Sequence, residues 1–172
     1  MMGTGRIHMY YGDGKGKTTA AVGQAVRAAG AGLQVLFFQF LKDNSSNERK
    51  ILESVPGITC LPGRDQVKFV SRMNGDEKAE LRHYNNKALD EIVKFCTNFD
   101  VLDESLCAIH LNVLSEEKIR SFLEHKPRGL EIIMTGHEVS QDLLDLADYA
   151  TMMMKVKHPY DRKVQAREGI EF

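Results

Sequence analysis

The sequence has no tryptophan, three cysteines and four prolines among its 172 residues, and its formal net charge is only −1. This charge balance argues against a large nucleic-acid interface, which needs a basic surface. No stretch approaches the roughly 20 apolar residues of a membrane-spanning helix. The first residues, MMGTGRIHMYYG, lack the apolar core and the cleavage site of a signal peptide. We therefore expect a cytoplasmic protein that binds neither nucleic acid nor membrane.

The cysteines, Cys60, Cys96 and Cys107, are odd in number and widely spaced. They form no CxxC pair and no zinc-ligand set, so we expect ordinary buried or half-buried thiols. Hydrophobic residues make up 42% of the chain and charged residues 27%, which is enough apolar surface for a packed core. The length fits a single domain over residues 1–172.

Apolar runs alternate with helical patterns along the chain, which is typical of a parallel α/β sheet. The predicted strands are Arg6–Tyr11, Gln34–Phe40, Ile58–Leu61, Phe99–Leu102, Leu130–Thr135 and Tyr149–Val156. The predicted helices are Lys17–Ala29, Asn47–Val55, Asp76–Thr97, Glu116–His125 and Gln141–Ala147, and Ser46, Ser115 and Ser140 are the expected N-caps of three of them. In such a sheet, ligands bind beyond the carboxyl ends of the strands.

The strongest motif lies between the first predicted strand and the first predicted helix, and reads Gly12-Asp13-Gly14-Lys15-Gly16-Lys17-Thr18-Thr19. Its glycines let the backbone curl so that N–H groups face a phosphate, and the helix N-terminus adds partial positive charge. Lys17 is then placed to reach the terminal phosphates of ATP, and the Thr18 hydroxyl to bind Mg²⁺. The spacing is a variant, because Tyr11 stands where the usual pattern has its first glycine. The alternative is a glycine-rich turn that binds no phosphate.

A second signal is the acidic pair Asp103 and Glu104 after a predicted strand, a position that holds or orients the metal ion in P-loop proteins. The alternative is a helix N-cap or a solvated loop. Weaker candidates end neighbouring strands at the same edge of the sheet: Gln39, Phe40 and Lys42, then Thr135, Gly136 and His137, then Lys155, Lys157 and His158. Together these features predict a three-layer P-loop NTPase-like α/β fold with a mostly parallel central sheet of roughly six strands.

The motif indicates a bound triphosphate and leaves the reaction open. No GxSxG motif occurs, and no Ser-His-Asp arrangement can be recognised. A kinase, an NTP-driven motor and a group transferase all remain compatible with the residues.

The run GRIHMYYGDGKGKTTAAVGQAVRAAGAG resembles the start of the P-loop ATP:corrinoid adenosyltransferases, whose loop reads G-[ND]-G-K-G-K-T-T. Further matches follow in order over nearly the whole chain: QVLFFQFLKD, LDE, MTGH and VKHPYDRKVQAREGIEF. The resemblance implies transfer of the 5′-deoxyadenosyl group of ATP to the cobalt of a reduced corrinoid, with release of inorganic triphosphate, in adenosylcobalamin synthesis or salvage. It also implies Mg²⁺ or Mn²⁺, an electron-donor flavoprotein and a homodimer. A small-molecule kinase or ATPase, or a non-catalytic ATP-binding relative, remains the alternative.

The resemblance also implies roles for individual residues. Lys17 and Glu104 match catalytic positions, and Thr18, Asp103 and Glu104 match the metal site. Residues that match the nucleotide and corrinoid site are Gly12, Asp13, Gly14, Lys15, Gly16, Lys17, Thr18, Thr19, Gln39, Lys42 and His137, with Phe69 as the aromatic that helps to strip the lower ligand from cobalt.

The chain departs from the family pattern in places. The run FDVLDE is shorter than the family's DLLVLDE, so this strand either pairs differently or is locally altered. His137 replaces the family's arginine after Thr-Gly, which predicts a triphosphate contact that is lost or pH-sensitive. The absence of tryptophan removes an aromatic that some members place beside the corrinoid.

Overall fold

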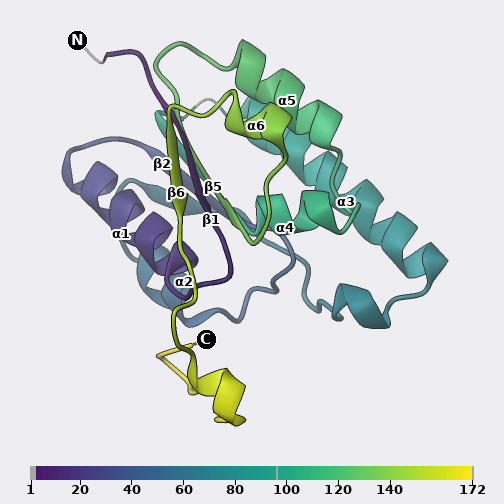
Figure 1. Ribbon diagram of the computed structural model, residues 1–172. Helices are drawn as coiled ribbons and strands as arrows, with labels where there is room; N and C mark the ends of the chain where they lie inside the picture. The colour runs from purple at the N-terminus through teal and green to yellow at the C-terminus, as the bar shows by residue number, and fades with distance from the viewer. Residues whose placement is uncertain (1–2, 96, 172) are drawn as a thin grey trace.

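The computed structural model describes residues 3–95 and 97–171, and it consists of a central sheet between two layers of helices (Figure 1). Cys96 and both ends of the predicted domain lie outside the described residues. The six strands, in the spatial order β3-β2-β4-β5-β1-β6, all pair in parallel. Their bounds are β1 (Ile7–Tyr11), β2 (Val35–Gln39), β3 (Ile58–Cys60), β4 (Phe99–Asp103), β5 (Glu131–Gly136) and β6 (Tyr149–Met152). The predicted α/β fold with a parallel sheet of about six strands is confirmed.

The helices connect the strands, as parallel pairing requires. Their bounds are α1 (Lys17–Gly30), α2 (Asn47–Leu52), α3 (Gly75–Lys94), α4 (Ser105–His110), α5 (Glu116–His125) and α6 (Gln141–Leu144), with short 3₁₀ turns η1 (Val70–Arg72) and η2 (Pro159–Arg162). Among the described residues, no helix is both long and apolar enough to cross a membrane.

Three of the helix starts test the predicted caps. The hydroxyls of Ser115 and Ser140 accept the predicted bonds, from the backbone N–H groups of Lys118 and Leu143 at 3.3 and 3.4 Å. Ser46 stands at the N-cap position of α2, as predicted, although its side chain makes no capping bond.

Helix α3 begins with a capping box that the sequence analysis did not predict. Asn74 Oδ1 accepts from the backbone N–H of Glu77, and the Glu77 carboxylate accepts from the backbone N–H of Asn74. Each pairing satisfies an N–H group that the helix itself leaves without a partner.

Neighbouring side chains of each strand enter different cores, because successive residues of a strand point to opposite faces of the sheet. In β2, Phe37 joins the core beneath α1 and α2, whereas Phe38 joins the core beneath α3, α4, α5 and α6. Helix α1 packs Ala21, Ala25 and Ala28 into the same core as Phe37, and such small side chains let the helix lie close to the sheet. Figure 1 shows α1 and α2 on one side of the sheet and the other helices opposite.

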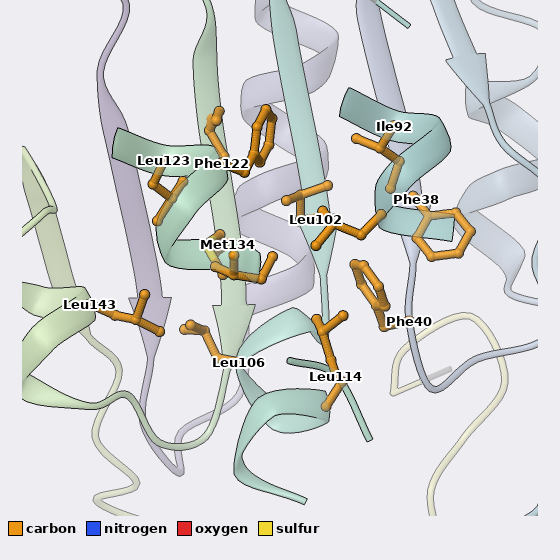
Figure 2. Close-up of a cluster of buried hydrophobic side chains, with 14 of the residues drawn as sticks. Phe38, Phe40, Ile92, Leu102, Leu106, Leu114, Phe122, Leu123, Met134 and Leu143 are labelled. Carbon is orange, nitrogen blue, oxygen red and sulfur yellow. The ribbon is translucent and has the colours of Figure 1, made fainter. Parts of the chain in front are cut away.

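The core on the second face is the larger one, and Figure 2 shows its aromatic and aliphatic side chains pointing toward one another from strands and helices. Phe38, Leu102 and Met134 come from three adjacent strands. Helices α4 and α5 contribute Leu106 and Phe122. This packing fixes the strands whose carboxyl ends carry the site described below.

The fourth strand settles one departure noted in the sequence. Although FDVLDE is short, β4 pairs along its full length with β2, from Val35 opposite Phe99 to Gln39 opposite Asp103. It also pairs with β5 on its other side. The strand is therefore an ordinary central strand, and it brings Asp103 level with Gln39.

The sixth strand ends at Met152, and the predicted extension to Val156 is wrong. Its partner β1 stops at Tyr11, whose carbonyl accepts from the N–H of Met153 at 2.7 Å. Beyond this point the chain follows the glycine-rich loop instead of a strand, and Met153 O accepts from Gly14 N at 2.7 Å.

Candidate functional site

The phosphate loop, residues 12–18, joins β1 to α1 and is shaped by glycine. Gly12 and Gly16 have φ values of 111° and 114°, which residues with a Cβ atom rarely adopt. A Cβ atom on Gly12 or Gly14 would lie 2.4 or 2.7 Å from the carbonyl oxygen of Met153. Glycine at these positions thus permits both the curl of the loop and its close approach to the C-terminal segment.

Lys17 lies inside the loop, with only 9% of its surface exposed. Its ammonium donates to the carbonyl oxygen of Gly14 at 2.8 Å. The positive charge is therefore held against the curled backbone, an arrangement that suits an anionic ligand. The neighbouring Lys15 and Thr19 are exposed at the rim of the loop.

Two hydrogen bonds fasten the C-terminal segment to the phosphate loop, one between backbone groups and one from a backbone N–H to a carboxylate. We call this pair the loop–tail clasp. Gly14 N donates to Met153 O at 2.7 Å, and Lys155 N donates to Asp13 Oδ1 at 2.9 Å. The second bond is the main reason why the pKa of Asp13 lies below its usual value. The Lys155 ammonium also contacts Asp161 at 2.9 Å, which extends the attachment into η2.

Asp103 is the centre of the site, and it is completely buried at the end of β4. Its Oδ1 accepts from the hydroxyls of Thr18 and Thr135 at 2.9 and 2.7 Å. Its Oδ2 accepts from Gln39 Nε2 and Lys42 Nζ, both at 3.0 Å. The ends of β2, β4 and β5 and the start of α1 therefore meet at one carboxylate.

This arrangement suits a hard divalent cation. Thr18 donates its proton to Asp103, so its oxygen lone pairs remain available to Mg²⁺. In the described part of the chain, no three His, Cys, Asp or Glu side chains are grouped as a metal cage. A cation here would thus take Thr18 from the protein, with Asp103 beside it, and complete its coordination with phosphate oxygens and water, as Mg²⁺ commonly does.

Glu104 follows in a strained backbone conformation, with φ of 59°. Such left-handed residues cluster at functional sites, where the surrounding structure holds them in place. The Glu104 N–H donates to Thr135 Oγ1 at 2.9 Å, and the residue stands at the N-cap of α4.

Burial, reinforced by the nearby Glu104 charge, raises the pKa of Cys107 to about 12. The thiol is thus a packed, protonated group, and Cys60 is a half-buried one, as expected for both cysteines.

Glu48 belongs to the same cluster, although the sequence analysis did not select it. Its Oε1 accepts from Gln39 Nε2 at 2.8 Å and lies 3.6 Å from Lys42 Nζ. Burial lowers the pKa of Lys42, but the charges of Asp103 and Glu48 outweigh it and leave this pKa above its usual value. The available signal was the position of Glu48 in the first turn of the helix that follows Gln39 and Lys42.

Other predicted residues are placed differently. The His137 side chain is exposed, while its backbone accepts from Gly12 N at 2.9 Å and donates to Cys107 Sγ at 3.2 Å. Phe69 is 75% exposed, and the Arg72 guanidinium lies over it, 5.6 Å from the centroid of the Phe69 ring.

The remaining candidates lie at the ends of strands. Phe40 is a core residue. Of the candidates at the other strand ends, Gly136 is buried and packs against the backbone of Cys107, Lys157 is exposed and half-buried His158 caps η2.

The geometry of a curled glycine loop, a buried lysine and a threonine bonded to a strand-end aspartate is that of a P-loop nucleotide site. The family model described as "ATP:corrinoid adenosyltransferase BtuR/CobO/CobP" matches residues 3–172. The chain belongs to this family. The resemblance drawn from the sequence motifs is thereby confirmed, and the protein is an enzyme of the transferase class.

Individual members of the corrinoid adenosyltransferase family are similar over almost the whole chain. The corrinoid adenosyltransferase of Escherichia coli K12 is 31% identical over 169 residues, which cover 98% of this chain and 86% of the relative. Corrinoid adenosyltransferase CobA of Salmonella typhimurium is 33% identical over 177 residues, with the same two coverages. The corrinoid adenosyltransferase of Sinorhizobium is 28% identical over 172 residues, covering 98% of this chain and 80% of the relative.

Proposed function

We propose that this corrinoid adenosyltransferase moves the 5′-deoxyadenosyl group of ATP to the cobalt of a reduced corrinoid and releases inorganic triphosphate. The observation that carries the proposal is the contact of Thr18 with Asp103 at the mouth of the phosphate loop. It combines an anion-binding backbone with a cation-binding hydroxyl, which is what a departing triphosphate requires.

The residues account for the chemistry without a side-chain nucleophile. The electron pair of Co(I) forms the bond to C5′ of ATP, and the C5′–O bond breaks with its electrons passing to the triphosphate. Cobalt is formally oxidised from +1 to +3 in this step. The protein's tasks are to hold the two substrates in line and to stabilise the charge that develops on the leaving group.

Each element of the phosphate loop serves the leaving group. The N–H groups of the curled backbone and the Lys17 ammonium lie where they can receive phosphate oxygens. Thr18 and Asp103 would hold Mg²⁺ or Mn²⁺, which supplies further neutralisation of the triphosphate. Glu104, fixed beside Asp103 by its bond to Thr135, would orient the water ligands of that cation.

The test is the identity of the products. The protein is incubated with ATP, Mg²⁺ and chemically reduced cobalamin, without light. The proposal expects the light-sensitive spectrum of adenosylcobalamin together with one equivalent of triphosphate. Release of ADP or free phosphate would instead indicate a kinase or ATPase, and tight ATP binding without transfer would indicate a non-catalytic relative.

The remaining expectations from the family resemblance stay predictions. They are an electron-donor flavoprotein that reduces the corrinoid, a homodimer, Phe69 on the corrinoid side, and a place in adenosylcobalamin synthesis or salvage. The Phe69 side chain is largely exposed, which is compatible with contact to a large planar ligand.

A further inference from the structure

The buried carboxylate of Asp103 is paired with the partly exposed ammonium of Lys42. Of the four side chains in the described part of the chain that donate to Asp103, those of Thr18, Thr135 and Gln39 are neutral, and that of Lys42 carries the charge. A buried carboxylate without a charged partner is costly, so Lys42 stabilises Asp103 in the nucleotide-free protein. The Lys42 side chain is 30% exposed, whereas that of Asp103 is completely buried. The lysine can therefore move without disturbing the core.

A second carboxylate lies next to this ion pair. Lys42 Nζ is 3.0 Å from Asp103 Oδ2 and 3.6 Å from Glu48 Oε1. Gln39 Nε2 donates to both of these oxygens, at 3.0 and 2.8 Å, so the amide holds the two carboxylates on either side of it. Glu48 itself is anchored in the first turn of α2.

The cluster also contains a hydrogen-bond acceptor that the protein leaves unused. Gln39 is 2% exposed, and its Oε1 has no donor among the described residues. The opposite assignment of the amide would turn its oxygen toward two carboxylates and is excluded by repulsion. Leaving a buried acceptor without a partner is unfavourable. The cluster is thus complete only when another donor, such as a cation-bound water, is present.

We propose that Glu48 is a positioning residue that receives the Lys42 ammonium when Mg²⁺ and ATP bind beside Asp103. The inference rests on the proposed function, because it requires a cation at Thr18. The cation and the ammonium repel one another across a single carboxylate, and only a small movement brings Lys42 onto Glu48. Glu48 therefore lowers the concentration of Mg²⁺ needed for nucleotide binding, although it does not touch the nucleotide.

The test measures ATP binding by calorimetry over a series of Mg²⁺ concentrations, with no corrinoid present. Four proteins are compared: the wild type, Glu48→Gln, Lys42→Met and the double variant. Glutamine keeps the acceptor for Gln39 and removes only the charge. Glu48→Gln should raise the half-saturating Mg²⁺ concentration about tenfold, the usual size of coupling between neighbouring charges, and Lys42→Met should lower it.

The double variant separates this inference from simple electrostatics. Without Lys42 there is no ammonium to receive, so Glu48→Gln should have little further effect in the Lys42→Met background. An equal shift in both backgrounds would mean that Glu48 acts only as a distant negative charge, and would overturn the inference. So would an unchanged Mg²⁺ dependence in Glu48→Gln.

Two further variants keep the result interpretable. Glu117→Gln removes an exposed carboxylate from the first turn of α5 and should leave the Mg²⁺ dependence unchanged. Glu48→Asp retains the charge and should restore most of the wild-type response, which a purely structural role of the longer side chain would not predict. Should the wild type itself bind no ATP at any Mg²⁺ concentration, the proposed function fails together with this inference. ATP binding with an unaltered Glu48→Gln profile refutes the inference alone.

Discussion

Among single residues, Lys17 holds its positive charge against the curled backbone of the phosphate loop. Its ammonium is buried and bonded to Gly14 O at 2.8 Å, so the side chain is already in position before a nucleotide arrives. Lys17→Ala should reduce turnover about 10²–10³-fold, as the loss of one preorganised electrostatic contact typically does. The measurement is the rate of triphosphate release. Lys50→Ala, an exposed position of α2, should be close to wild type.

At His137, a substitution should strengthen the binding of triphosphate instead of weakening it. Its backbone is fixed by Gly12 and Cys107, while its side chain is exposed at the end of β5. His137→Arg places a permanent charge with a planar fork of donors there, which suits phosphate oxygens better than imidazole. We expect inorganic triphosphate to bind several-fold more tightly, by roughly the 0.5–1.5 kcal/mol of one added hydrogen bond. Equal affinities in a calorimetric titration would remove this position from the triphosphate site.

At the scale of elements, the loop–tail clasp should form only because Gly14 has no Cβ atom. A methyl group there would lie 2.7 Å from Met153 O and 2.9 Å from the Met154 carbonyl carbon, both of which are backbone atoms that cannot turn aside. Gly14→Ala should therefore separate the segment around Met153 from the phosphate loop. Trypsin should then cleave after Lys155 and Lys157 faster than in the wild type. Unchanged cleavage would show that the clasp tolerates the methyl group.

A second glycine serves as the control for that experiment. Gly23 lies exposed in the middle of α1, with no atom within 4 Å of the place where a Cβ atom would stand. Gly23→Ala should raise the free energy of unfolding by roughly 0.5–1 kcal/mol, because alanine loses less backbone entropy in a helix. Chemical denaturation measures the gain, and the rate of tryptic cleavage after Lys155 should not increase.

The elements themselves show what the sequence can and cannot predict. Five of the helices and all six strands follow from apolar patterns, because a strand buried on both faces, such as Val35–Gln39, needs an unbroken apolar run. Helix α4 was not predicted. It spans only Ser105–His110, too short for a helical periodicity, and it begins after Glu104 in a left-handed conformation. The predicted end of β6 was wrong because the length of this strand depends on where its partner β1 ends.

The site shows the same division. Lys17, Thr18 and Asp103 were predictable, since a phosphate-binding loop and a strand-end carboxylate leave local signatures. Glu48 and the carbonyl of Met153 were not. Glu48 contacts Gln39, which lies on a different element. The carbonyl of Met153 contacts Gly14, which lies far away in the chain. Such contacts arise from tertiary packing, and a single sequence carries little trace of them.

For the molecule as a whole, Asp100 should dominate one part of the dependence of stability on pH. The side chain lies in β4 with 3% of its surface exposed, and it contacts the hydroxyl of Thr97. Burial raises the pKa of its carboxyl to about 6, and the bond to Thr97 offsets only part of this rise. In the unfolded chain the group titrates near its ordinary value of 3.8.

The sign follows from proton binding. Between about pH 4 and pH 6 the folded protein holds the Asp100 proton and the unfolded chain has released it, so stability falls as the pH rises through this window. The fall should level off above about pH 6 and amount to roughly 3 kcal/mol at most, at 1.36 kcal/mol for each pKa unit.

Asp100→Asn cannot ionise, so its free energy of unfolding should exceed that of the wild type increasingly from pH 4 to pH 6. Urea denaturation at half-unit steps measures this difference, and Asp65→Asn, which removes an exposed carboxylate, should follow the wild-type curve. A constant difference between Asp100→Asn and the wild type across the window would mean that Asp100 is already ionised within the folded core.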